Sequence, residues 1–194
     1  AFFVAVGAGA MLVVAAESAR ARVGALVYAL GLAGLLGTSA LYHRITWRPR
    51  ARMWMRRVDH SMIFVLIAGT VTPIALLALD DPLRIVLLAV AWGGTAAGVL
   101  LNLLWPRAPK PVSAAVYLAI GWSGAIAVPE LASYAWTALV LVAIGGVLYT
   151  VGAIIYALGR PNPWPRVFGY HEIFHALVVA AAAVHFAAVS IVVL

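Results

Sequence analysis

Residues 58–79 read VDHSMIFVLIAGTVTPIALLAL and decide the fold class of this chain. After Asp59 and His60 the stretch has no ionisable side chain, and a helix needs roughly 20 apolar residues to cross a hydrocarbon core of about 30 Å. Over the whole chain, 65% of the 194 residues are hydrophobic and 10% are charged, whereas a soluble domain has about 25% charged residues. The sequence therefore predicts an integral membrane protein with no separate soluble domain.

Further apolar runs lie on both sides of this stretch, separated by charged or proline-rich breaks. They predict an all-α, seven-transmembrane helix bundle that forms a single domain, with spans at residues 1–16, 23–43, 58–79, 85–104, 112–129, 135–158 and 169–194. The first run is short for a span and has neither an initiator Met nor a polar leader. We therefore expect the sequence to begin within the first helix.

Basic residues indicate the orientation of the helices, because short loops rich in Lys and Arg stay in the cytoplasm. The connections after the first, third and fifth helices contain only Arg20, Arg22 and Arg84. The connections after the second, fourth and sixth contain Arg44, Arg48, Arg50, Arg52, Arg56, Arg57, Arg107, Lys110, Arg160 and Arg166. We predict a cytoplasmic N-terminus and a C-terminus on the outer side of the cell membrane.

Several function classes do not fit this pattern. The net charge of +7 is explained by topology, so we expect no nucleic-acid partner. G-protein-coupled receptors have the opposite orientation, and a retinal Schiff base needs a lysine inside a span, whereas the single lysine, Lys110, falls in a predicted loop. There is no cysteine, which excludes disulfides, thiolate metal sites and cysteine nucleophiles.

Four ionisable residues fall at one predicted depth, at the cytoplasmic ends of helices. His43 ends the second helix, Asp59 begins the third, and His171 and His175 begin the seventh. His171 and His175 are four residues apart and so share a helical face, and Ser39 lies one turn deeper than His43. Because ionisable residues inside a membrane are costly and usually functional, we expect these side chains to converge.

The chemistry of this set favours a metal site. Three imidazoles suit Zn²⁺, and three protein ligands leave a fourth position for water, so we predict Zn²⁺ bound by His43, His171 and His175. Asp59 would orient the water or take its proton, and Ser39 would donate a hydrogen bond to a ligand, to the water or to a developing oxyanion. The same ligands could instead form a structural site without turnover.

Three other polar residues receive simpler interpretations. His60 follows Asp59 and points about 100° away from it, so we expect a packing or supporting role and not a fourth ligand. His185 lies about 15 Å beyond His175, where we expect an isolated buried hydrogen bond. Glu172 falls in the first turn of its helix, where an acid caps the helix favourably. The arginine-rich stretch 44–57 could also attract anionic lipid headgroups.

At these residues the sequence resembles the hemolysin III and progestin-adipoQ receptor (PAQR) family of seven-helix membrane proteins, and especially its bacterial branch. The resemblance implies a multi-pass protein of a bacterial inner or plasma membrane. Ser39 and His43 stand in SALYH, like the family's S-x-x-x-H at the end of the second helix. Asp59 stands in RVDHSMIFVLIAGTVTP, like the signature of the third helix. His171 and His175 stand in GYHEIFH, like the H-x-x-x-H of the seventh helix.

The resemblance implies zinc bound by the three histidines, a water held by Asp59, and ceramidase-like hydrolysis or a role in haemolysis and membrane homeostasis. We therefore carry two hypotheses. The first is a zinc-dependent hydrolase of a lipid amide or ester, with membrane lipids as partners and a lipid as substrate. The second is a non-enzymatic sensor, receptor-like protein or pore former with structural zinc. A haem protein using His43 and His171 as axial ligands would leave His175 and Asp59 without a role.

Overall fold

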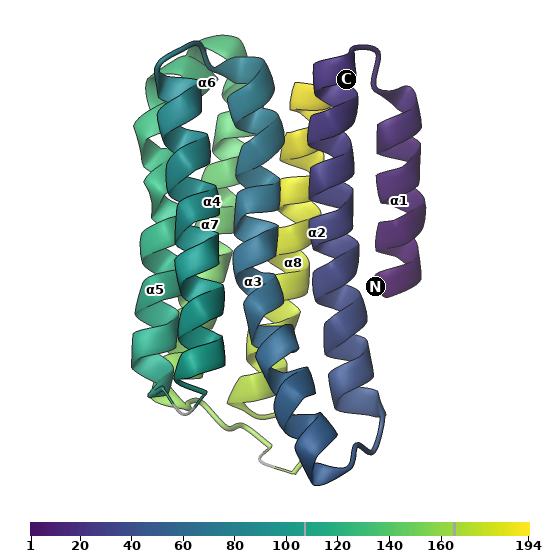
Figure 1. The fold of residues 1–194 in the computed structure, drawn as a ribbon, viewed down its shortest axis with the longest axis vertical. Helices are drawn as coiled ribbons and strands as arrows, with labels where there is room; N and C mark the ends of the chain where they lie inside the picture. Colours follow the sequence, from purple (N-terminus) through teal and green to yellow (C-terminus); the bar gives the residue numbers. More distant parts are fainter. Residues whose placement is uncertain (107, 165) are drawn as a thin grey trace.

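The structure is a computed structural model that describes residues 1–106, 108–164 and 166–194; Arg107, one of the basic residues used to predict the orientation, lies outside these ranges. The described residues form a bundle of roughly parallel and antiparallel helices (Figure 1). The elements are α1 (Phe2–Ala15), α2 (Ala19–Arg44), α3 (Pro49–Ala78), α4 (Leu83–Leu104), α5 (Lys110–Trp122), the 3₁₀ helix η1 (Ser123–Ala127), α6 (Val128–Tyr134), α7 (Trp136–Leu158) and α8 (Tyr170–Val193).

The helices confirm the all-α membrane-protein fold, with one difference in the number of full spans. Among the described residues, six segments are long and apolar enough to cross a membrane: α2, α3, α4, the segment from α5 to α6, α7 and α8. The first predicted span, residues 1–16, corresponds to α1, which is apolar but has only 14 residues. At 1.5 Å per residue it is about 21 Å long, shorter than a hydrocarbon core.

Two boundaries differ from the sequence prediction because basic residues were assigned to connections. α3 begins at Pro49 and not at residue 58, so the arginine-rich segment before Val58 is helical. Arg, Ala and Met are good helix formers, and a proline at the first position starts a helix readily. Lys110 likewise does not lie in a loop, because it is the first residue of α5 and is followed by Pro111.

The fifth span is interrupted and runs further than expected. The prediction ended it at Pro129, but the chain continues as η1 and then α6 to Tyr134. Pro129 has no backbone N–H, and its ring would collide with the carbonyl of Ala125 in a continuous α-helix. The span therefore passes through a tighter turn, and Pro129 lies at the start of α6.

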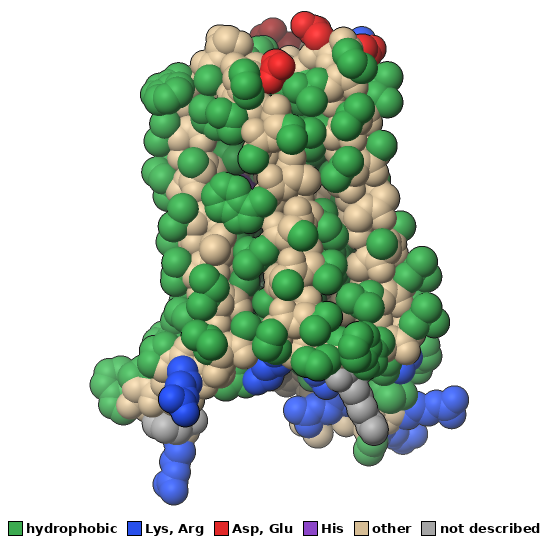
Figure 2. Space-filling model, turned by 90° about the vertical axis from the view of Figure 1, so that its left-hand side faces the viewer, with side chains coloured by type: hydrophobic (Ala, Val, Ile, Leu, Met, Phe, Trp, Pro, Cys, Tyr) green, Lys and Arg blue, Asp and Glu red, His purple; other side chains and the backbone are tan. Residues whose placement is uncertain are grey.

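Charged side chains lie at the two ends of the bundle. Figure 2 shows basic side chains at the lower end, acidic side chains at the upper end and a hydrophobic surface between them. The connections α2–α3, α4–α5 and α7–α8 all lie at the basic end (Figure 1). The separation of charge on which the predicted orientation depends is therefore present in the fold.

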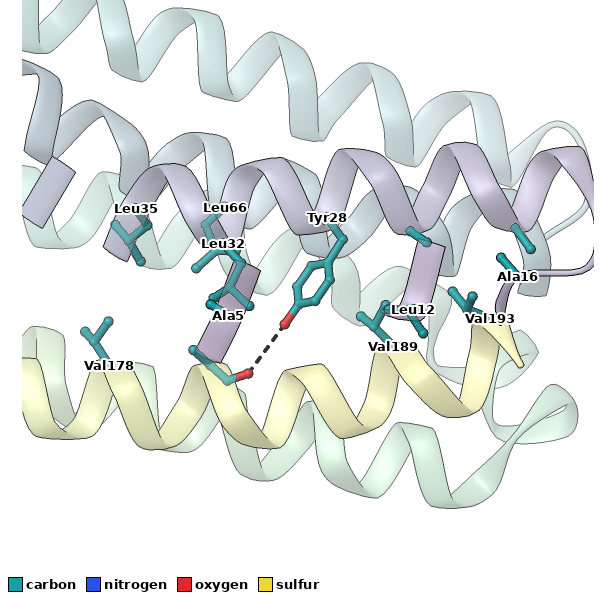
Figure 3. Close-up of a cluster of buried hydrophobic side chains, with 13 residues drawn as sticks. Ala5, Leu12, Ala16, Tyr28, Leu32, Leu35, Leu66, Val178, Val189 and Val193 are labelled. Atoms are coloured by element: carbon teal, nitrogen blue, oxygen red, sulfur yellow. Dashed lines mark hydrogen bonds between the residues drawn. The ribbon is translucent and has the colours of Figure 1, made fainter. Parts of the chain in front are cut away.

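Close packing of α2 against α3 and α8 brings the polar residues of these helices together. A Cβ added to Gly24 of α2 would lie 2.9 Å from Pro73 Cα of α3, so the two backbones touch at this point. The fully buried Tyr28 donates a hydrogen bond from its hydroxyl to the Ala182 carbonyl of α8, at 3.4 Å (Figure 3). Small residues at helix contacts are typical of membrane bundles, where packing drives association.

Candidate metal centre

His43, His171 and His175 meet at the basic end of the bundle. Each offers a ring nitrogen, and these three atoms all lie within 4.8 Å of one another. The Nε2 atoms of His171 and His175 are 3.1 Å apart, and the ring of His43 lies 5.0 Å from that of His175 between centroids. The predicted convergence of histidines from α2 and α8 is therefore present in the structure.

The start of α8 places two of these histidines on one face. The Gly169 N–H donates to Glu172 Oε2 at 2.8 Å, so the Glu172 side chain caps the N-terminus of the helix. His171 and His175 follow in the first two turns, four residues apart, which directs both rings toward the end of α2. The capping role expected for Glu172 is confirmed.

The donor set fits a small, borderline-soft cation such as Zn²⁺. Nitrogen ligands bind zinc at about 2.0–2.1 Å, which puts tetrahedral ligand atoms roughly 3.3 Å apart. The 3.1 Å separation of the two α8 nitrogens is close to this value, and the third nitrogen lies within reach. His43 is exposed and the two α8 histidines are partly buried, so the group is open on one side.

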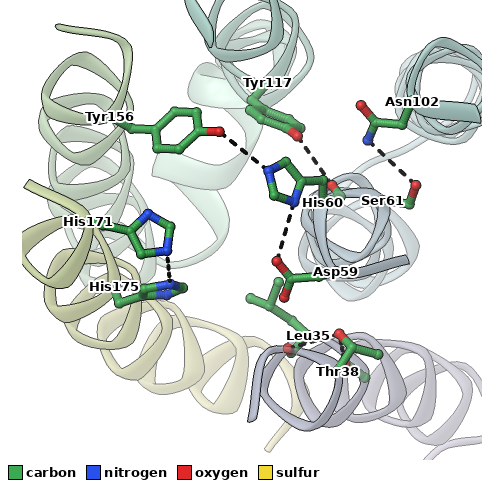
Figure 4. A network of polar contacts seen from close by, with 11 residues as sticks. Leu35, Thr38, Asp59, His60, Ser61, Asn102, Tyr117, Tyr156, His171 and His175 are labelled. Carbon is green, nitrogen blue, oxygen red and sulfur yellow. Dashed lines mark hydrogen bonds and ion pairs between the residues drawn. The ribbon is translucent and has the colours of Figure 1, made fainter. Parts of the chain in front are cut away.

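Asp59 and Ser39 face the same space as the histidines. Both line a cavity of about 810 Å³ together with His43, His171 and His175. Asp59 is 8% exposed, and Figure 4 shows its carboxylate and the α8 histidines on facing walls of this space. The structure thus gathers all five residues that the sequence singled out around one cavity.

His60 lies beside this group and is not part of it. Its Nδ1 is 3.3 Å from Asp59 Oδ2, and its Nε2 is 3.3 Å from the hydroxyl of Tyr156 in α7. Tyr117 of α5 donates a hydrogen bond to the His60 carbonyl at 3.3 Å. His60 is therefore not one of the three clustered histidines, and its side chain contacts Asp59 although it was expected to point about 100° away.

Sequence reasoning missed the two tyrosines, Tyr117 and Tyr156, which line the cavity. Both are buried within otherwise apolar helices. A buried tyrosine usually needs a hydrogen-bond partner for its hydroxyl, and this requirement is the signal by which the sequence could have pointed to them.

His185 lies far from the centre, as expected. Its Nε2–H donates to the Val142 carbonyl of α7 at 3.2 Å. The imidazole occupies the space where Gly145 has no side chain. His185 is therefore an isolated buried histidine that joins α7 to α8.

A second cavity adjoins the first and is almost entirely apolar. Its volume is about 210 Å³, and it extends among α3, α5, α7 and α8 away from the basic end. The two cavities share the lining residues Leu35, Ile63, Tyr117, Ala153, Phe174 and Val178. The histidines therefore line a cavity that has an apolar cavity of the bundle next to it.

Comparisons with known proteins match most of the chain. Residues 1–186 match the model of the family described as "Haemolysin-III related". The chain is 33% identical over 161 residues to "Hemolysin-3 homolog" of Bacillus subtilis (strain 168), covering 82% of this chain and 72% of the relative. It is 32% identical over 170 residues to "Hemolysin-3" of Bacillus cereus, covering 87% and 74%.

A third similarity reaches the receptor branch of the same family. The chain is 30% identical over 187 residues to "Adiponectin receptor protein" of Drosophila melanogaster. The matched region covers 83% of this chain and 40% of the relative. The family match and the two bacterial relatives agree with the expected multi-pass location in a bacterial plasma membrane. This chain therefore belongs to the hemolysin III and PAQR family of membrane proteins, the same family that its histidine-containing and aspartate-containing motifs resemble.

Proposed function

We propose that this membrane protein is a zinc-dependent hydrolase of a lipid amide or ester, ceramidase-like in its chemistry, that contributes to membrane homeostasis. One observation carries the proposal: three imidazoles and a buried carboxylate line one cavity, and an apolar cavity adjoins it. Catalytic metal sites combine such ligands with an open position and a nearby general base.

His43, His171 and His175 would hold the metal. Zinc held there would act as a Lewis acid and would lower the pKa of a water molecule to about 7. Asp59 would orient that water and accept its proton, because an ionised carboxylate only accepts hydrogen bonds. Ser39 would donate a hydrogen bond from its hydroxyl to the carbonyl oxygen of the substrate, where negative charge develops.

The lipid substrate is supported by the shape and lining of the cavities. An acyl chain can lie in the apolar cavity with its carbonyl group among the histidines, since the two spaces adjoin. Burial of each CH₂ group contributes about 0.8 kcal/mol when the chain comes from water, but much less when it comes from lipid. The cavity would therefore select by position and shape more than by hydrophobicity.

The alternative is a sensor, receptor-like protein or pore former in which zinc is structural. It is favoured by the placement of the histidines on α2 and α8, because a metal bound by them would join the ends of these two helices. The names of both Bacillus relatives also refer to hemolysis. In this alternative Asp59 has no chemical role, which separates the two functions.

The test combines metal analysis with lipid mass spectrometry on purified protein. We expect one zinc per chain in the wild type, loss of zinc in His175→Ala, and retention in His185→Gln as the matched histidine control. After incubation with a mixed lipid extract, wild type should release free fatty acid and Asp59→Asn should not, although it keeps zinc. Zinc retained in the wild type with no lipid changed would favour the structural alternative.

A further inference from the structure

We propose that His60 is the positioning residue for Asp59, and that it connects the carboxylate on α3 to the hydroxyl of Tyr156 on α7. In this arrangement His60 Nδ1–H donates to Asp59, and Tyr156 donates to His60 Nε2. The effect on turnover rests on the proposed hydrolase function, whereas the pairing itself does not.

The geometry places His60 between two polar partners. Its Nδ1 lies 3.3 Å from Asp59 Oδ2 and its Nε2 lies 3.3 Å from the Tyr156 hydroxyl (Figure 4). The Nδ1 atom is buried and makes no hydrogen bond to any described residue, and the Asp59 carboxylate is the charged group that lies beside it. Because an unpaired buried donor is unfavourable, pairing with the adjacent carboxylate is the favoured outcome.

The chemistry of the partners fixes the direction of both interactions. An ionised carboxylate accepts hydrogen bonds and cannot donate them, so the proton must be on His60 Nδ1. In a neutral imidazole the other nitrogen is then an acceptor. The Tyr156 hydroxyl can donate to it, and the chain of contacts from Tyr156 to Asp59 is complete.

Both ends of His60 are held by other helices. Tyr117 of α5 donates to the His60 carbonyl at 3.3 Å, which fixes the backbone. The Tyr156 ring packs against Phe174 at 5.1 Å between centroids, and the Lys110 ammonium lies 5.5 Å from its centre. A rigid tyrosine therefore sets the imidazole, and the imidazole sets the carboxylate of Asp59.

The first experiment measures the pairing without any substrate. Protein labelled with ¹⁵N-histidine is studied by NMR in lipid nanodiscs with zinc added, and the His60 signals are assigned by their absence in His60→Asn. We expect a proton on Nδ1, an Nδ1 signal that moves in Asp59→Asn, and an Nε2 signal that moves in Tyr156→Phe. A proton on Nε2, or an Nδ1 signal unaffected by Asp59→Asn, would overturn the pairing.

The second experiment measures kcat and KM on two probes, a ceramide and a phosphatidylcholine that carry the same fluorescent acyl chain. His60→Ala should lower kcat about 10–100-fold, as loss of a supporting hydrogen bond does, with KM and zinc content unchanged. His60→Asn should retain activity to within tenfold, because its amide nitrogen can take the place of Nδ1. His60→Gln places its amide nitrogen nearer Nε2 and should resemble the alanine variant.

Ser61→Ala is the matched control. Ser61 is the next residue on α3, but its hydroxyl contacts Asn102 of α4 and does not line the cavity. The kcat of Ser61→Ala should therefore equal that of the wild type. Equal kcat for His60→Ala and wild type, or equal loss in the Asn and Gln variants, would refute the positioning role. Absence of hydrolysis of both probes by the wild type would instead refute the proposed function, and the NMR experiment would still decide the pairing.

Discussion

Two adjacent glycines of α7, Gly145 and Gly146, should respond oppositely to substitution by alanine. A Cβ at Gly145 would overlap the Cδ2 and Nε2 atoms of the His185 ring, whereas a Cβ at Gly146 would meet only Trp122, at 4.0 Å. Both positions lie inside the same helix. Any difference between the two variants therefore reports the contact with His185 and not the helix itself.

The magnitude follows from what the overlap must displace. Moving the His185 ring breaks its hydrogen bond to the Val142 carbonyl, 3.2 Å long, and His185 is only 8% exposed. Leaving these buried groups unpaired costs about 1–3 kcal/mol, and overpacking adds about 1–3 kcal/mol. Replacing glycine by alanine inside a helix returns about 1 kcal/mol. We expect a net loss of about 1–5 kcal/mol for Gly145→Ala and no loss for Gly146→Ala.

The assay is reversible unfolding of the purified protein in mixed micelles, followed by far-UV circular dichroism. Zinc content is measured in parallel, and both variants should keep it, since His185 is remote from the candidate metal centre. Equal stability of Gly145→Ala and Gly146→Ala would refute the packing of His185 against Gly145. Loss of zinc in the first variant alone would show that this contact also shapes the centre.

Three further outcomes test other parts of the structure. Tyr28→Phe removes the hydrogen bond to Ala182 and should lower the free energy of unfolding by about 0.6 kcal/mol, the average for such bonds between membrane helices; a loss above about 2 kcal/mol would contradict this. Zinc at 100 times its Kd should raise the stability of the wild type by about 2.7 kcal/mol, and an equal rise in His175→Ala would count against the three-histidine site. Asp59→Asn should reduce kcat on the lipid probes about 10²–10⁴-fold with zinc content unchanged, and an undiminished kcat would exclude Asp59 as the base.

The limits of the sequence prediction are clearest where one residue type serves two purposes. Arginine was treated as a marker of connections, and this assigned residues 49–57 to a loop although they form the first turns of α3. The same charges correctly identified which connections lie at one end of the bundle (Figures 1 and 2). Lys and Arg in short connections report the side of the membrane, whereas helix boundaries depend on caps and on proline.

The sequence by itself determined the membrane class, the family motifs and the local geometry of His171 and His175. The class follows from composition, and the shared face of the two histidines follows from the 3.6-residue turn of one helix. Neither depends on contacts with distant parts of the chain. The capping of α8 by Glu172 is equally local.

Only the tertiary structure decided that His43 reaches within 4.8 Å of the α8 histidines and that His60 lies between Asp59 and Tyr156. The rotation of one helix against another is set by close contacts such as Gly24 with Pro73. These contacts join residues far apart in the chain, and a hydrophobic pattern cannot specify them because lipid and protein interior are equally apolar.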